Sequence, residues 1–198
     1  MTKYSAAIAT LSTLLVSSTV HAQHPAMPPG MTHEQHLAQI QKDEEMKRRG
    51  ATAMGFDQDA VTHHFLLKPT GGAIEVQVRD SADVKNLDAI RAHLRDIATR
   101  FAAGNFDAPF ETHGEVPPGV PAMRRLKGTI IYSYRQTASV GRVEIITQNT
   151  ATLATVHEFL RYQIAEHHTG DPLRIRVSHA GRESDRFVSL AMPARNRP

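Results

Sequence analysis

A strand–turn–strand–helix pattern occurs twice along the chain, and it constrains the fold more than any other sequence feature. Short runs rich in β-branched and aromatic residues, with apolar and polar residues in alternation, predict the strands. Glycine-containing turns separate the two strands of each pair, and an amphipathic stretch follows each pair. The predicted strands are residues 61–67, 73–78, 129–134 and 142–147, and the predicted helices are residues 83–103 and 149–168.

This order predicts an α+β fold. Two hairpins can join into one four-stranded antiparallel sheet, and the two helices can then bury their apolar stripes on one face of it. The two helices align without a gap at an offset of 66 positions, which places Leu94 on Leu160 and Gly104 on Gly170. The match is explained either by an internal repeat of two ββα units or by the period that all amphipathic helices share.

The first residues have the pattern of a secretory signal peptide. Lys3 supplies a positive charge, an apolar and small-residue run follows, and Val20-His21-Ala22 offers small residues for cleavage. An uncleaved membrane anchor is the alternative, but the run is short for a membrane span. We therefore expect export to the periplasm or the exterior, with no transmembrane segment left after cleavage of residues 1–22.

The rest of the chain divides by composition. Residues 23–54 form a leader that begins with three prolines and a glycine and continues as a polar helix from a capping box at Thr32–Gln35 to Gly50. Residues 55–172 form the ββαββα core, and residues 173–198 form a C-terminal hairpin or tail. The segment 105–126, with four prolines, is long for a connector and is either a functional loop or a strap packed over the sheet.

Composition excludes several chemistries. The chain has no Cys, so it has no disulfide, thiolate metal site or cysteine nucleophile. Its formal net charge of +3 with neutral His is too small for a nucleic-acid binder that works by bulk charge. Twelve histidines predict a steep rise in positive charge below about pH 6.5. Any specific chemistry must therefore come from histidine, carboxylate and methionine side chains.

The leader is the first candidate metal site. Imidazole and thioether groups are copper ligands, and thioethers in particular favour Cu(I). The alternative is a polar tether in which these residues have no ligand. The candidate ligands fall within 13 residues and are His24, Met27, Met31, His33 and His36.

The core histidines are weaker candidates. His63 and His64 are neighbours on a strand and must face opposite sides of the sheet. His157 lies on the apolar stripe of its helix, where a hydrogen-bonded core histidine is the favoured interpretation. His167 and His168 end the same helix, where a protonated imidazole would complement the helix dipole.

Catalysis is less favoured than binding. There is no nucleophile elbow of the GxSxG type. A hydrolase remains an alternative if histidine and aspartate side chains converge in the folded chain. The residues considered for it are Asp57, Asp59, His64, His113 and Asp171.

Four segments carry a resemblance to known sequences: Met54–Gln58, Thr62–Leu66, Val156–Ile164 and His168–Asp171. In these segments the chain resembles a family of uncharacterised exported bacterial proteins, over roughly residues 27–173. The resemblance implies an exported origin and transfers no functional residue.

The sequence therefore predicts a small exported binding module that holds a transition metal such as copper through His and Met. The first alternative is a module that binds an envelope protein or another ligand without a metal. The second is a His/Asp-dependent hydrolase.

Overall fold

The computed structural model describes residues 27–175. Two compact units divide between Gln39 and Ile40, within the first helix, α1 (His33–Met54). Residues 40–54 therefore belong to the unit that holds the sheet. Within residues 27–175, no helix is both long enough and apolar enough to cross a membrane.

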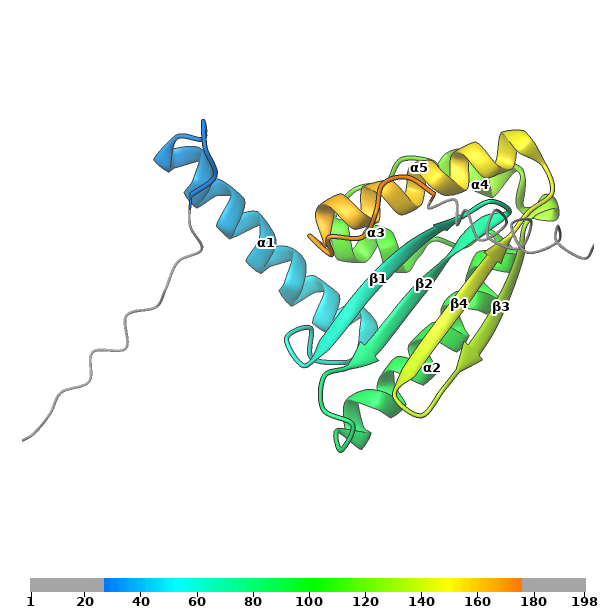
Figure 1. Ribbon diagram of the computed structural model, residues 1–198, viewed down its shortest axis with the longest axis horizontal. Coiled ribbons are helices and arrows are strands. Elements are labelled where there is room, and N and C mark those ends of the chain that lie inside the picture. The colour runs from blue at the N-terminus through cyan, green and yellow to red at the C-terminus, as the bar shows by residue number, and fades with distance from the viewer. Residues whose placement is uncertain (1–26, 176–198) are drawn as a thin grey trace, which may run out of the picture. The chain divides into compact units, whose positions relative to one another are not determined.

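Four antiparallel strands form one sheet, as predicted (Figure 1). They are β1 (Val61–Lys68), β2 (Gly71–Val78), β3 (Ile131–Gln136) and β4 (Val140–Ile146). The order across the sheet is β1-β2-β4-β3, so each hairpin contributes one central and one edge strand. The predicted α+β class and the joining of the two hairpins are thus confirmed, with strand ends shifted by up to two residues.

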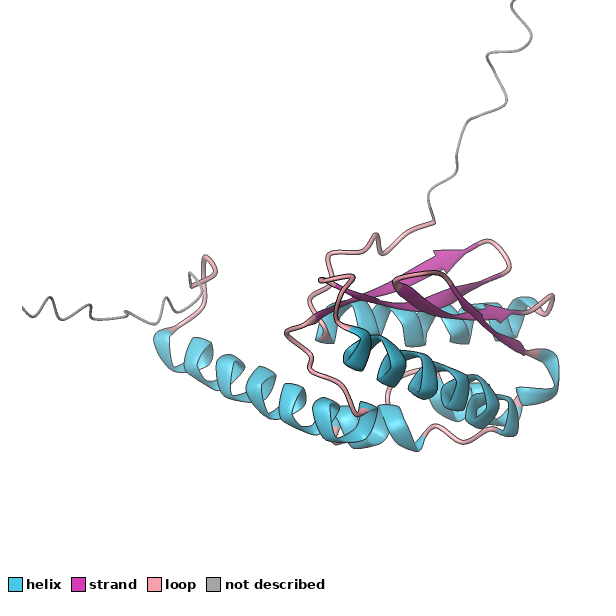
Figure 2. Cartoon of the chain, turned by 90° about the horizontal axis from the view of Figure 1, so that it is seen from below, coloured by secondary structure: helices cyan, strands magenta, loops and turns pink. Residues whose placement is uncertain are grey.

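Both predicted core helices are present on one face of the sheet (Figure 2). The helix α2 (Val84–Ala103) begins at Asp83, whose carboxylate accepts from the Asn86 amide, and ends at Gly104 in the left-handed conformation. The helix α5 (Thr150–Glu166) begins at Asn149, whose side chain accepts from the Thr152 amide. These side-chain caps at Asp83 and Asn149 therefore fix where both helices begin.

The two halves exchange their helices. The helix α2 packs mainly on β3 and β4, the hairpin of the second half, whereas α5 packs on β1 and β2. The pairing of β2 with β4 is also symmetric between the two halves. Gly72 of β2 pairs with Ile145 of β4, and Gly141 of β4 pairs in the equivalent way with Val76 of β2. The register is compatible with an internal repeat, one of the two explanations for the aligned helices.

Gly72 and Gly141 allow the helices to approach the sheet. A Cβ atom on Gly72 would lie 2.2 Å from Leu160 Cδ1 and 2.4 Å from the Leu66 carbonyl oxygen. A Cβ atom on Gly141 would lie 2.9 Å from Leu94 Cδ1. Leu94 and Leu160 are the residues that the offset of 66 aligns, so both helices make the same kind of close contact with the central strands.

The segment 105–126 is structured. It contains α3 (Asp107–His113) and α4 (Val120–Arg125), and a 3₁₀ turn, η1 (Lys127–Thr129), leads into β3. Val120 and Met123 are fully buried, and Phe106 stacks on Phe101 of α2 at 4.3 Å between ring centroids. The segment is therefore packed against the core, as the strap interpretation predicts.

The leader helix and the C-terminal segment differ from what the sequence predicts or lie outside the described residues. The sequence predicts that the leader helix ends at Gly50, but α1 continues to Met54, because Gly50 is a buried residue within the helix and does not adopt the left-handed conformation of a helix end. The left-handed glycine that follows the helix is Gly55. The predicted C-terminal hairpin lies mostly outside the described residues, and residues 173–175 are not in a strand.

The close contact at Gly72 predicts a graded loss of stability. We expect Gly72→Ala to lower the free energy of unfolding by about 3 kcal/mol, because the added carbon meets backbone that cannot move aside. Gly141→Ala should cost about 1 kcal/mol, since only side-chain ends must shift. Gly128→Ala is the control, with no atom within 4 Å of the new carbon. Urea unfolding measures all three, and equal values for Gly72→Ala and Gly128→Ala would contradict the packing described.

Candidate functional site

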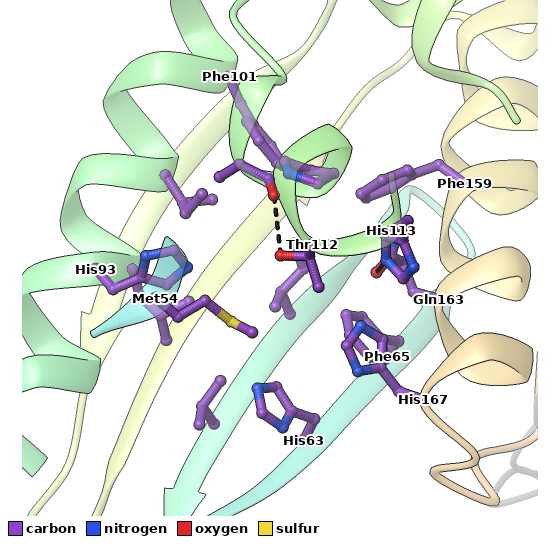
Figure 3. A pocket seen from close by; sticks show the side chains of 16 residues that line it. Met54, His63, Phe65, His93, Phe101, Thr112, His113, Phe159, Gln163 and His167 are labelled. Atoms are coloured by element: carbon purple, nitrogen blue, oxygen red, sulfur yellow. Dashed lines mark hydrogen bonds between the residues drawn. The ribbon is translucent and has the colours of Figure 1, made fainter. Parts of the chain in front are cut away.

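A cavity of about 50 Å³ lies between the sheet and the helices α2, α3 and α5 (Figure 3). Apolar walls come from Phe65 of β1, Ile97 and Phe101 of α2, and Phe159 of α5. We call this cavity the histidine pocket because an imidazole reaches it from each of four elements. Its polar and sulfur-bearing side chains are Met54, His63, His93, Thr112, His113, Gln163 and His167.

The imidazoles lie close to one another. The ring of His167 lies 5.4 Å from that of His63 and 5.1 Å from that of His113, measured between centroids. Phe56 bridges the remaining pair, with its ring 5.9 Å from His63 and 5.8 Å from His93. Strand β1, helix α2, helix α3 and the end of α5 therefore each bring one histidine to a common apolar site.

Burial keeps these four histidines neutral. Loss of solvation lowers the pKa of His63 and of His93 to about 4. The same cause lowers the pKa of His113, although its hydrogen bond to Gln163 acts in the opposite direction. Burial, together with the nearby imidazoles, lowers the pKa of His167 well below 6.5. The steep charge rise expected from twelve histidines is wrong for these four.

Three buried nitrogen atoms at the pocket have no hydrogen-bond partner among residues 27–175. They are His63 Nε2, His113 Nδ1 and Gln163 Nε2. His113 and Gln163 are more than nine-tenths buried, and their one mutual bond joins His113 Nε2 to Gln163 Oε1 at 3.0 Å. Buried polar groups in folded proteins are nearly always paired, so these three atoms require an explanation.

A second cavity of about 220 Å³ adjoins the histidine pocket. The two cavities share Met54, His63, Thr112 and His167 in their walls. We call the larger cavity the vestibule. It is further lined by side chains of both charges, among them Asp43, Lys47 and Glu166.

Ion pairs hold the second half of α1 beside the vestibule. Lys42 pairs with Glu166 at 2.8 Å, and Lys47 pairs with Asp59 at 2.9 Å. The Arg49 Nε donates to the carbonyl oxygen of Thr112 on α3 at 3.0 Å. The vestibule therefore has a defined wall made by residues 42–54.

The leader residues predicted to bind copper are only partly described. His24 lies outside the described residues. Met27 is exposed, and His33 and His36 lie one turn apart in the first turns of α1, after a capping box in which Thr32 and Gln35 bond reciprocally. No cluster of three His, Asp or Glu side chains that could hold a metal ion occurs in residues 27–175.

The hydrolase residues fall on two sides of the sheet. His64 lies on the face opposite the helices, where its Nδ1 is 3.0 Å from Asp171 Oδ1. The other Asp171 oxygen accepts from the Phe65 amide and from the Thr169 hydroxyl, so this carboxylate caps the edge of β1. His113 lies on the helix side, in the histidine pocket. The structure therefore joins His64 to Asp171 and separates both from His113.

The remaining predicted histidines have structural contacts. His157 is buried, and its Nε2 donates to the carbonyl oxygens of Lys68 at 3.0 Å and Gly71 at 2.9 Å, as expected for a hydrogen-bonded core histidine. His168 lies beyond the end of α5, with Nε2 3.4 Å from Asp43. The expectation of a protonated imidazole at His167 is wrong, because that ring is buried and neutral.

Sequence reasoning missed part of the pocket. His93 is three residues after Ile90 and four before Ile97, so its position on the apolar face of α2 was readable from the helical period. Met54 and Gln163 gave no comparable signal. Their roles depend on the extension of α1 past Gly50 and on the approach of α3 to α5.

Comparison with known proteins gives no match to a protein family, to a curated protein or to a solved structure.

The neutral histidines predict a loss of stability in acid. A pKa near 4 in the folded chain against 6.5 in the unfolded chain means that only the unfolded state gains a proton between these values. The free energy of unfolding is therefore highest above pH 6.5 and falls as the pH drops toward 4. The loss is at most about 3 kcal/mol for each of His63 and His93.

Urea unfolding at pH 7.5, 6, 5 and 4.5 tests this, with His63→Leu as the variant. We expect the variant to lose less stability between pH 7.5 and 4.5 than the wild-type protein. Parallel curves for the two proteins would show that His63 is not held neutral by the fold.

Proposed function

We propose that this protein is a binding module, not an enzyme, and that it holds a small molecule at the histidine pocket and vestibule. The proposal includes the export predicted from residues 1–22, which would place the module in the periplasm or outside the cell. The observation that carries it is the convergence of three unpartnered buried nitrogens from β1, α3 and α5 on one apolar cavity. A bound ligand would supply the missing partners.

The arrangement favours binding over catalysis. General acid–base chemistry near neutral pH needs a group whose pKa lies near the working pH. The pocket histidines are instead held neutral by burial, and no carboxylate lines the pocket. The His64–Asp171 pair has the orientation of a catalytic dyad, but no described serine or threonine hydroxyl bonds to His64, and Asp171 is engaged in capping β1.

The other face of the sheet offers less for a partner protein. Its centre is occupied by ion pairs that join Lys68 to Glu144 and Arg142 to both Glu75 and Glu144. Its exposed apolar side chains are the neighbouring Ile131 and Ile146 at one end. The pocket is therefore the stronger candidate site.

Copper is the second candidate ligand. Neutral imidazole is the form of histidine that binds metals, and Met54 adds a thioether of the kind that suits Cu(I). Because no three His, Asp or Glu side chains in residues 27–175 are placed to share an ion, a copper site here would require side chains to move.

The test is a screen of neutral and charged small molecules by ¹H–¹⁵N NMR at pH 7.5, with a Cu(I) titration against a competing chelator in parallel. We expect ligands that shift the amide signals of residues around the pocket. Ala108→Val adds two carbons to a wall of the pocket and should abolish that binding. His64→Ala, one residue from His63 but on the other face, is the control and should bind normally.

Two results would contradict the proposal. If no molecule in the screen binds the wild-type protein, the pocket holds only water and the proposal fails. Equal binding by wild-type protein and Ala108→Val would place the ligand elsewhere. Tight stoichiometric Cu(I) binding that Ala108→Val or Met54→Leu removes would select the copper alternative.

A further inference from the structure

We infer that the ligand of the histidine pocket is a neutral, hydroxyl-bearing aromatic molecule of the phenol class, bound with its hydroxyl in the pocket and its ring toward the vestibule. The inference rests on the proposed function and adds the chemistry of the ligand. Charge, hydrogen-bonding capacity and cavity size each restrict the ligand separately.

Charge excludes ionised groups from the inner cavity. No Lys, Arg, Asp or Glu side chain lines the histidine pocket, and its imidazoles are neutral because they are desolvated. A carboxylate or an ammonium group would lose its hydration there without an opposite charge to pair with, which is costly. The group that enters the pocket must therefore be uncharged.

Hydrogen bonding favours a hydroxyl. Because His113 Nε2 and Gln163 Oε1 bond to each other, His113 Nδ1 is left as an acceptor and Gln163 Nε2 as a donor. If the Gln163 amide instead donates to the ring of His113, the groups left are the other ring N–H of His113 and the amide oxygen of Gln163. These are again one donor and one acceptor. A hydroxyl both donates and accepts, so it satisfies either arrangement.

Size places the body of the ligand in the vestibule. A cavity of about 150 Å³ accommodates benzene. The histidine pocket, at about 50 Å³, is too small for a ring but holds a hydroxyl group. The vestibule, at about 220 Å³, is large enough for one ring and carries the adaptable side chains of Met46 and Met54.

The walls where the two cavities meet favour a flat molecule. The rings of His63 and His167 lie at an interplanar angle of 21°, and that of Phe65 lies 34° from His167. These rings present faces and edges on which an aromatic ring can pack. An aliphatic alcohol would satisfy the same nitrogens with a poorer fit to these walls.

Three probes of one shape separate these contributions. The ring and methyl group are the same in p-cresol, toluene and p-toluate, which differ in carrying a neutral hydroxyl, no polar group or a carboxylate. We would measure their affinities for the full chain by ligand-observed NMR titration at pH 7.5. The expected order is p-cresol, then toluene about five- to tenfold weaker, then p-toluate without measurable binding.

Variants test the assignment of the hydroxyl. Gln163→Leu should weaken p-cresol about five- to tenfold and leave toluene unchanged, since only the hydroxyl loses a partner. The NMR spectrum of Gln163→Leu shows whether that variant folds. If it does not, His63→Phe is used as the second variant. Gln77→Leu is the matched control, because Gln77 lies on the sheet face away from the pocket.

The outcomes separate the inference from the proposed function. Equal affinities for p-cresol and toluene, or tighter binding of p-toluate, would overturn the phenol class while leaving a ligand-binding pocket in place. Binding of other screened molecules but of none of the three probes would do the same. Failure of every molecule in the screen would overturn both, because the three nitrogens would then be hydrated only.

Discussion

The close approach of two helices to the two central strands is the contact on which the other features of the core depend. Glycines at positions 72 and 141 leave no Cβ, so Leu160 of α5 and Leu94 of α2 rest directly against the backbone of β2 and β4. Leu94 also lines the histidine pocket. The same contact that seats α2 on the sheet therefore positions the wall from which His93 reaches the cavity, and α3 covers the space left between α2 and α5 (Figure 3).

The pocket shows how burial decides the chemistry of a side chain. Histidine in water changes charge near pH 6.5, but four histidines here share one apolar site and remain neutral. His157 is also buried, yet both of its backbone acceptors are supplied by the β1–β2 turn, so it serves the fold. The difference between His157 and His113 is a missing partner at His113 Nδ1, and the proposed ligand would supply that partner.

Much of the fold was predictable from the sequence because it depends on local signals. The alternation in residues 73–78, the apolar period from Leu87 to Phe101 and the caps at Asp83 and Asn149 each act within a few residues. Gly50 resembles a helix end because glycine commonly follows a helix, but here it is buried within α1, and the glycine in the left-handed conformation is Gly55. The site was predicted less well: His63, His113 and His167 are named in the sequence analysis, though not as one cluster, whereas His93, Met54 and Gln163 depend on which helix faces which strand.

The two faces of the sheet divide charge and apolar surface between them. On the open face, Arg142 pairs with Glu75 and Glu144, and Lys68 also pairs with Glu144, so the charges there satisfy one another. On the helix face the pocket contains no charge, and three nitrogens remain without partners among the described residues. Charges that are already paired gain little from a ligand, because binding must first separate them. Unpaired neutral groups gain a hydrogen bond without that cost, so the proposed ligand would gain more on the helix side of the sheet than on the open face.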